Sequence, residues 1–471
     1  MTPRIHTLLR WCFVSAFIVV AGAASYFQEI GLLLLPVAIV GAVLLVQYPQ
    51  LLFCLLLISI PWSVEFNFNT HLATDLPDEP LMLLMSLSVV IWFLYGAKFS
   101  GRIHPLLMII LLQLAWTVLT VITSSEPLLS IKFLLAKCWY LLAFMAAPLV
   151  LFRDERILRR SAILLLTSMM LCMAVAVFRH YNYHWAFEKI NDAVQPFFHN
   201  HVNYSALLVF MVPLQLAVIR LTASKNLRFA VLVLMVVTIA ALYFSYARGA
   251  WLALLFGGIS YGLLKRKWLM PFFIISVVVI CAGLLWISRN GRYLKFSNDY
   301  QSTIFHKDFR EHLIATYELK DVSTAERLYR WVAGVRMASD KWITGFGPTS
   351  FYRHYKSYAQ PAFKTWVSRN EEQSTVHNYF LLVFIEQGLM GFMLWIALLA
   401  ASFYRAQVVY HSAKEKFLKV VILAASAILV MECVINFLSD MIETDKAGSV
   451  FYVCVAVIIV ADCRTRNREM V

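Results

Sequence analysis

A histidine at the start of a long apolar segment is the residue best placed for acid–base chemistry. His377 stands in STVHNYFLLVFIEQGLMGFM, where a polar region gives way to apolar residues. Its neighbours decide whether a histidine is neutral or charged near pH 7, which suits general-base catalysis. The alternative is a histidine at a membrane interface whose polar atoms are satisfied by its neighbours. Asn378 follows and either orients the imidazole or caps the start of the helix.

Three arginines are candidates for binding an anionic group. Arg248, in FSYARGAWLAL, is a lone cation at a tight turn between two apolar segments. Its guanidinium either binds phosphate oxygens or lies at the level of the lipid headgroups. Arg327 and Arg330 are three residues apart, so on a helix they share one face and are able to clamp one diphosphate. Charge runs are more often solvated faces, which is the favoured interpretation for Arg330 and Arg336.

Two lysines and one glutamate lie within apolar segments. Lys132 and Lys137 are five residues apart, so they point about 140° apart around a helix and only one of them faces a given site. Glu386 lies nine residues after His377. It is therefore on the opposite helix face and ~13 Å deeper, which makes it a poor direct partner for the imidazole. We expect Glu386 to have a structural partner such as Lys137.

A second histidine pattern occurs in FFHNHVNYSA, which places His199, His201 and Asn203 at another helix start. The spacing of the two histidines resembles a metal-binding pair, but no carboxylate or cysteine cluster stands nearby, so no metal site is predicted. The sequence also lacks a Walker loop, a dinucleotide fingerprint and an HExxH motif. We therefore expect no cofactor and no nucleic-acid partner.

The elements that must position these residues are membrane helices. The chain has 471 residues, of which 61% are hydrophobic and 14% charged, and its mean hydropathy is +0.71. A soluble protein carries about a quarter charged residues, so the composition argues against a soluble enzyme. We predict an all-α polytopic membrane protein whose eight cysteines are small apolar residues rather than disulfides or zinc ligands.

Segments of ~20 apolar residues predict the membrane spans. The candidates are 8–27, 30–48, 50–62, 80–98, 105–123, 129–151, 161–180, 203–221, 229–246, 249–264, 269–287, 378–403, 418–438 and 448–462. The charge pattern requires an odd number of crossings before the acidic loop at 62–79. If the short segment at 50–62 does not span, two crossings are lost together, so the prediction is 12–14 transmembrane helices. Segment 8–27 is expected to be a retained helix rather than a signal peptide.

Basic residues are concentrated on one side of this topology. With alternate threading, 21 of the 41 Lys and Arg residues fall in loops of one side, which identifies that side as cytoplasmic and places both termini there. The division is membrane helices at 1–287, an outer cap loop at 288–377, and C-terminal membrane helices with a short cytoplasmic tail at 378–471.

The cap loop is too rich in aromatic residues for disorder. Its residues 324–340 predict an amphipathic helix, and GFGP at 345–348 predicts a tight turn. The apolar face of that helix is expected to carry Leu328, Trp331 and Val335. We expect a folded, basic cap over the outer mouth of the bundle.

Two stretches resemble the signature of the O-antigen ligase and polymerase superfamily of bacterial inner membranes. They are RLYRWVAGVRMASDKWITGFGPTSF at 327–351 and HNYFLLVFIEQGLMG at 377–391. ARGAW around Arg248 and NYSA at Asn203 extend the resemblance over most of 200–403. The pattern does not separate ligase from polymerase.

The resemblance implies a GT-C-like glycosyltransferase that works on the periplasmic side without metal or nucleotide. The donor would be a glycan on undecaprenyl diphosphate, and the acceptor a sugar hydroxyl on lipid A core or on another lipid-linked glycan. His377 would deprotonate the acceptor, while Arg248 and Arg327 would hold the diphosphate. The expected substrate-binding residues are Arg330, Asn378, Lys132, Asn203 and His199. Because a glycosyl diphosphate already has a good leaving group, positioning, cations and one base suffice, and inversion is expected.

The alternative from another class is a lipid-linked oligosaccharide flippase. Flippases are expected to have two similar halves with short outer loops, whereas here one outer loop of about ninety residues interrupts an unequal chain. A ligase with lipid A core as acceptor is favoured over a polymerase. Membrane lipids are the remaining expected partners.

Overall fold

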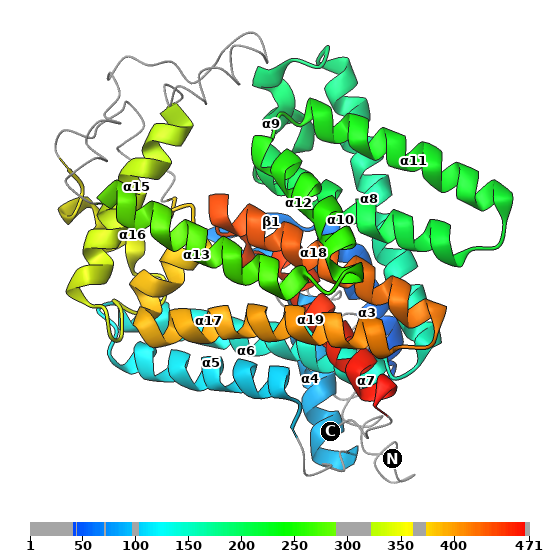
Figure 1. Cartoon of the computed structure of the whole chain (residues 1–471), viewed down its shortest axis with the longest axis horizontal. Coiled ribbons are helices and arrows are strands. Elements are labelled where there is room, and N and C mark those ends of the chain that lie inside the picture. The colour runs from blue at the N-terminus through cyan, green and yellow to red at the C-terminus, as the bar shows by residue number, and fades with distance from the viewer. Residues whose placement is uncertain are drawn as a thin grey trace, which may run out of the picture.

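The computed structural model describes residues 41–43, 45–69, 72–96, 103–288, 322–360 and 374–466. In this part of the chain almost every element is a helix (Figure 1). The first half contains α3 (Pro49–Ser59), α4 (Asp78–Gly96), α5 (Pro105–Ile122), α6 (Pro127–Leu141), α7 (Ala147–Leu151), α8 (Glu155–Asn182) and α9 (Ile190–Val194). The predicted all-α fold of a polytopic membrane protein is confirmed.

The second half contains the helices that surround the candidate site. They are α10 (His201–Leu221), α11 (Lys225–Phe244), α12 (Arg248–Lys265), α13 (Leu269–Ser288), α15 (Val322–Asp340), α16 (Phe351–His354), α17 (Tyr379–Ser412), α18 (Lys416–Leu438) and α19 (Asp445–Thr465). A hairpin of β1 (Val64–Asn69) and β2 (Leu72–Leu76) is antiparallel, with Val64 opposite Leu76.

Local signals explain where several helices begin. Pro49, Pro105 and Pro127 each occupy the first turn of a helix, where the missing N–H costs nothing. The carboxylate of Asp154 accepts from the amide of Arg156 at 2.8 Å at the start of α8. Such caps satisfy amides that have no partner within the helix.

Nine helices among the described residues are long and apolar enough to cross a membrane. They are α4, α5, the α6–α7 segment, α8, α10, α11, α17, α18 and α19. The predicted spans at 249–264 and 269–287 form α12 and α13, which are not in this set; the apolar part of α13, Leu269–Gly283, is shorter. The predicted span at 8–27 lies outside the described residues. The total of 12–14 therefore stays a prediction.

The segment at 50–62 is part of a sharply bent pair of helices. Gly41–Gln47 and Pro49–Trp62 meet at 113°, which is the geometry of a broken span or a re-entrant loop. Together they count as at most one further crossing, which gives up to ten. The segment at 50–62, which the sequence left open as a membrane span, therefore begins directly after this bend.

Helices α18 and α19 form the centre of the bundle (Figure 1). Helix α12 packs along α18, where Gly257 leaves room for the side chain of Met431. Helix α5 packs along α17, and Trp116 Nε1 donates to the carbonyl of Gln387 at 2.8 Å. Helix α11 is the least buried of the spans. Helices α18 and α19 are thus the most buried of the membrane-spanning helices, and the other helices pack around them.

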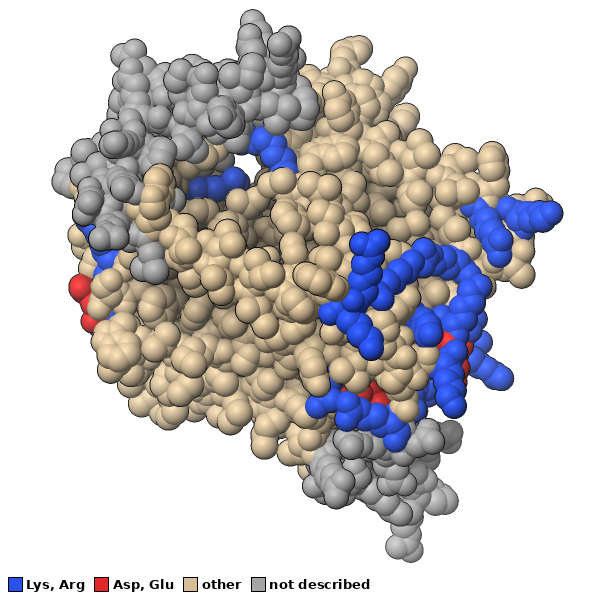
Figure 2. All heavy atoms as spheres, viewed as in Figure 1, with Lys and Arg blue, Asp and Glu red and all other residues tan. Residues whose placement is uncertain are grey.

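One end of the bundle carries the basic loops, and we call it the basic face. Contacts link these loops: Arg159 lies 4.3 Å over the ring of Phe417, and His411 Nε2 lies 3.0 Å from the carbonyl oxygen of Leu264. Figure 2 shows blue side chains gathered at the lower right, near the end of α17 and the start of α18. The residues of the basic face are 153–160, 220–228, 265–267, 405–419 and 464–466. The predicted clustering is confirmed, whereas its assignment to the cytoplasm stays a prediction.

Candidate active site

His377 lies at the end of the bundle opposite the basic face, just before α17. Asn378 caps this helix, since its Oδ1 accepts from the amide of Leu381 at 3.0 Å. The backbone of His377 is left-handed with φ of 52°, a conformation that is uncommon for a residue with a side chain. The amide of His377 donates to Thr375 Oγ1 at 3.3 Å. This strained turn fixes the position of the imidazole at the start of α17.

Arg330 on α15 contacts the imidazole directly. Its Nη1 lies 3.0 Å from Nε2 of His377 and donates to the carbonyl of Thr375 at 3.1 Å. Only 6% of Arg330 is exposed. The expectation that Arg330 belongs to a solvated face is therefore wrong, because α15 packs this face against α17 and the segment before it.

The predicted helix at 324–340 is confirmed as α15, but its apolar face is only partly the one expected, since Trp331 packs against Phe437 whereas Val335 does not face the core. The buried apolar side chains of α15 are Ala325, Tyr329, Ala333, Met337 and Ala338. Val335 is 49% exposed instead. Small side chains allow α15 to approach α17 closely; at Gly334, an added Cβ would lie 2.8 Å from the side chain of Ile385.

Asp440 completes the cluster from the C-terminal side of α18. The amide of Tyr379 donates to the carbonyl of Ser439 at 2.9 Å, which joins the start of α17 to the end of α18. Asp440 Oδ1 then lies 3.9 Å from Nδ1 of His377, and Thr375 donates its hydroxyl proton to Oδ2. Asp440 was not predicted as a site residue from the sequence. Its only local signal is a polar stretch, SDMIETDK, between two apolar spans.

Burial and the charges in this cluster keep the imidazole neutral. Burial, followed by the positive charges of Arg330 and Arg327, lowers the pKa of His377 to about 3. Burial raises the pKa of Asp440, although the hydrogen bond from Thr375 opposes this change. Because a guanidinium only donates hydrogen bonds, the contact with Arg330 makes Nε2 the acceptor. The ring proton of the neutral histidine is then on Nδ1, which faces Asp440.

Two further predicted arginines lie at this end of the bundle. Arg327 is close enough for its charge to lower the pKa of His377. Arg248 is the first residue of α12. The next residue, Gly249, packs against Leu438 at the end of α18, where an added Cβ would lie 3.3 Å from Leu438 Cδ1. The start of α12 therefore lies beside the chain segment that carries Asp440.

Lys137 and Glu386 do not form the pair that was expected. Lys137 Nζ donates to both carboxylate oxygens of Glu443 at 2.9 Å, and the hydroxyl of Tyr379 donates to the same carboxylate. Glu386 accepts instead from the amide of Phe351 at 3.3 Å. The proposed Glu386–Lys137 pair is thus wrong, because α17 directs Glu386 toward α16 rather than toward α6.

The predicted GFGP turn is confirmed, and it is attached to a kink in α17. The amides of Phe346 and Gly347 donate to the carbonyls of Ile385 and Glu386 at 3.0 and 2.9 Å. Gly388 has φ of 67°, and an added Cβ would collide with the carbonyl of Ile343. The kink therefore docks the segment after α15 onto the helix that follows His377.

A cavity of about 680 Å³ adjoins the cluster through Glu443. Among its lining residues are His199 and Asn203, two of the predicted substrate-binding residues, together with Lys137 and Lys446. Lys132 is exposed and does not line this cavity. The structure thus brings His377, Arg330 and Arg327 together. Lys132 lies outside the cavity, whereas Lys137 lines it.

In the second histidine pattern, FFHNHVNYSA, His201 and Asn200 have structural roles at the start of α10. The ring of His201 lies 2.9 Å from Oδ1 of Asn191, and the amide of His201 donates to the same oxygen at 2.9 Å. Asn200 caps α10 by accepting from the amides of Val202 and Asn203 at 3.0 Å. In the ranges that the structure covers, no three His, Cys, Asp or Glu residues converge as a metal-ligand set.

The fold and the cluster define a multi-pass membrane protein with a candidate acid–base site. Residues 230–396 match the family model described as O-antigen ligase. This match covers less than half of the chain and agrees with the resemblance of the sequence motifs to the O-antigen ligase superfamily. The matched region contains Arg248, Arg327, Arg330 and His377 and ends before Asp440.

The chain is also similar to a curated protein of Salmonella typhimurium (strain LT2) named O-antigen ligase. The two are 24% identical over 213 residues, which is 43% of this chain and 46% of the relative. The match therefore spans less than half the length of the relative.

Proposed function

We propose that this protein transfers a glycan from undecaprenyl diphosphate to a sugar hydroxyl of lipid A core. It would work on the periplasmic side of the bacterial inner membrane as a metal-independent, inverting glycosyltransferase of the GT-C type. The observation that supports this most is the partly buried cluster in which Arg330 lies 3.0 Å and Asp440 3.9 Å from the two ring nitrogens of His377. A base and cations are what displacement of a diphosphate requires.

His377 acts as the general base through Nε2. The acceptor hydroxyl gives its proton to Nε2 while its oxygen attacks the anomeric carbon of the donor. The bond from that carbon to the diphosphate oxygen breaks, and its electron pair leaves with the diphosphate. A single displacement of this kind inverts the anomeric configuration. The side chain of His377 is 31% exposed, so an acceptor is able to reach it.

Arg330 must release Nε2 before this step, since in the free protein it donates to the same nitrogen. A diphosphate beside α15 attracts both Arg330 and Arg327, because a guanidinium binds phosphate oxygens with paired hydrogen bonds. Neutralising these two charges removes part of the cause that lowers the pKa of His377. The donor therefore makes His377 a stronger base as it binds, and Arg248 adds a third cation on the leaving group.

Asp440 is a positioning residue in this proposal. It lies on the Nδ1 side of the imidazole and is held by the hydroxyl of Thr375. Movement of the ring by less than 1 Å would bring Nδ1–H within hydrogen-bond range. The carboxylate then stabilises the imidazolium that forms when Nε2 takes the proton.

The test is glycan transfer by the purified full-length protein in detergent. Wild-type protein receives lipid-linked donor with and without lipid A core. Product that appears only with the core supports the ligase; lengthened lipid-linked chains without it support a polymerase of the same superfamily. A flippase would leave the donor bond intact, and that result would overturn the proposal. The anomeric configuration of the product, read by NMR, tests inversion.

A matched pair of histidine variants separates catalysis from folding. His377→Gln is expected to lose transfer, whereas His411→Gln, on the basic face, is expected to retain it. His411 lies 3.0 Å from the backbone carbonyl of Leu264 and against the ring of Tyr410, so the control removes a histidine of the same protein without touching the cluster.

A further inference from the structure

An apolar crevice lies between helices near the basic face. Its volume is about 300 Å³, and its walls come from α8, α10, α18 and α19. Leu166, Leu214, Ile428 and Val453 represent the four walls. Arg159 is the one charged residue among the described residues that line it. An apolar space with a single cation suits a hydrocarbon chain whose polar end lies at the arginine.

The crevice is open toward the membrane. Ile163 on α8 and Leu227 on α11 line it and are 54% and 46% exposed. Helix α11 is the least buried of the membrane-spanning helices. A lipid chain is therefore able to enter laterally between α8 and the α10–α11 hairpin.

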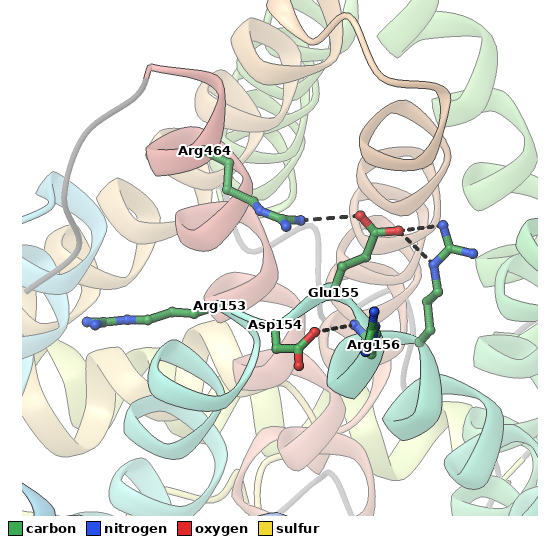
Figure 3. A pocket seen from close by; sticks show the side chains of 6 residues that line it. Arg153, Asp154, Glu155, Arg156 and Arg464 are labelled. Atoms are coloured by element: carbon green, nitrogen blue, oxygen red, sulfur yellow. Dashed lines mark hydrogen bonds and ion pairs between the residues drawn. The ribbon is translucent and has the colours of Figure 1, made fainter.

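The polar end of the crevice joins a group of arginines. Figure 3 shows this shallow site, where Arg156 and Arg464 lie near Asp154 and Glu155 while the side chain of Arg153 points away from the two carboxylates. Arg159 lines both the arginine site and the apolar crevice. The cationic and apolar parts are thus two ends of one continuous surface.

Both carboxylates of the arginine site already have partners in the protein. Asp154 caps the start of α8 through the amide of Arg156. Glu155 accepts from Nε of Arg159 at 2.8 Å and lies 3.7 Å from Arg464. Nη1 of Arg464 is buried and has no hydrogen-bond partner among the described residues. Four arginines against two engaged carboxylates leave the site cationic.

Arg159 is held in place for binding at the junction. Glu155 fixes its Nε side, and its guanidinium lies over the ring of Phe417, 4.3 Å from the centroid. Phe417 itself lines the crevice. Glu155 accepts hydrogen bonds from Nε and Nη2 of Arg159, so the N–H groups of Arg159 Nη1 remain for a phosphate. A fixed guanidinium loses little conformational entropy on binding.

We propose that this surface binds one anionic diacyl phospholipid of the leaflet at the basic face. The headgroup phosphate contacts Arg159, Arg156 and Arg464, and one acyl chain fills the crevice. Basic pockets between membrane helices are suited to anionic lipid headgroups. The general excess of basic residues in cytoplasmic loops explains why charges lie near these helix ends. It does not explain why one of these arginines also lines an apolar crevice. The site lies at the opposite end from His377 and is independent of the proposed function.

The experiment measures lipid binding to the purified full-length protein in detergent by native mass spectrometry. The probes are phosphatidylglycerol, phosphatidylcholine with the same acyl chains, and glycerol 3-phosphate, which has no chains. Wild-type protein is expected to bind phosphatidylglycerol most tightly. Each arginine near the surface contributes about fivefold in affinity, so Arg156→Gln together with Arg159→Gln is expected to weaken binding by roughly 25-fold.

Matched variants test both halves of the site. Lys265→Gln with Arg266→Gln removes two cations of the basic face outside the site and is expected to leave the binding unchanged. Ala162→Phe and Ala217→Phe fill the crevice from α8 and α10 and are expected to weaken binding of the lipid while the unfolding temperature without lipid is retained. Equal binding of the two phospholipids, or equal losses in the two charge variants, would overturn the proposal. Glycerol 3-phosphate binding as tightly as phosphatidylglycerol would exclude the crevice.

Discussion

Replacement of Arg330 tests how the cluster sets the basicity of His377. Arg330→Gln removes a positive charge 3.0 Å from Nε2 while keeping a side chain of similar length. Without that charge the imidazolium is less disfavoured, so the pKa of His377 rises. Because transfer needs the neutral ring, activity is lost as the pH falls through this pKa. The acidic limb of kcat/KM therefore moves to higher pH in the variant.

The size of this change follows from the causes of the low pKa. The pKa of His377 falls from 6.5 to about 3, and burial is the largest cause, followed by Arg330 and then Arg327. Arg330 therefore accounts for less than half of the fall, and its removal is expected to raise the pKa by about one pH unit. Arg330→Gln combined with Arg327→Gln raises it further, since both positive charges are then absent.

The assay is the initial rate of glycan transfer at low donor concentration between pH 2.5 and 8, a range that includes the pKa of about 3 in the wild-type protein. Arg330→Lys is the matched control because it keeps the charge, and its acidic limb is expected to stay near the wild-type position although its rate falls. Each sample is returned to pH 7 to show that activity recovers. A limb that stays in place in Arg330→Gln, or moves equally in Arg330→Lys, would refute the electrostatic argument.

Three further predictions test other parts of the structure. Asp440→Asn is expected to lower kcat about tenfold or more with little change in KM, because the ring loses its carboxylate partner; Asp340→Asn is the control, and equal losses would remove the positioning role. Gly388→Ala is expected to lower stability by about 2 kcal/mol or more through left-handed strain and the collision with Ile343. Gly258→Ala has open space around it and is the matched control in thermal unfolding. An unchanged unfolding temperature of Gly388→Ala would contradict the strain expected at the kink. Transfer is expected to survive EDTA, and loss that a divalent ion restores would contradict metal independence.

Features that depend on neighbouring residues in the sequence were predicted well. The helix at 324–340 and the turn at 345–348 form where the sequence places them, because amphipathic spacing and glycine conformation are local properties. Asn378 caps its helix for the same reason. Long apolar segments likewise predicted most of the membrane-spanning helices, since each must satisfy its own backbone hydrogen bonds.

Contacts between distant segments were predicted poorly. Arg330 is buried because Thr375 and His377, more than forty residues away, accept its hydrogen bonds. Lys137 pairs with Glu443, which is 306 residues distant. Neither partner is identifiable from spacing along one helix, because helix packing decides which side chains meet. Asp440 was missed for the same reason, although its place between two apolar spans marked it as a polar residue near a helix end.

The most direct test of His377 as the general base is a single turnover of purified donor by His377→Ala. Labelled lipid-linked glycan and lipid A core are mixed with excess protein, and both transfer and donor binding are followed at pH 7.5. Donor binding is expected to stay within about threefold of wild type while transfer falls by ~10² or more. Transfer at the wild-type rate would show that the imidazole is not the base, and the proposed reaction would have to proceed without it.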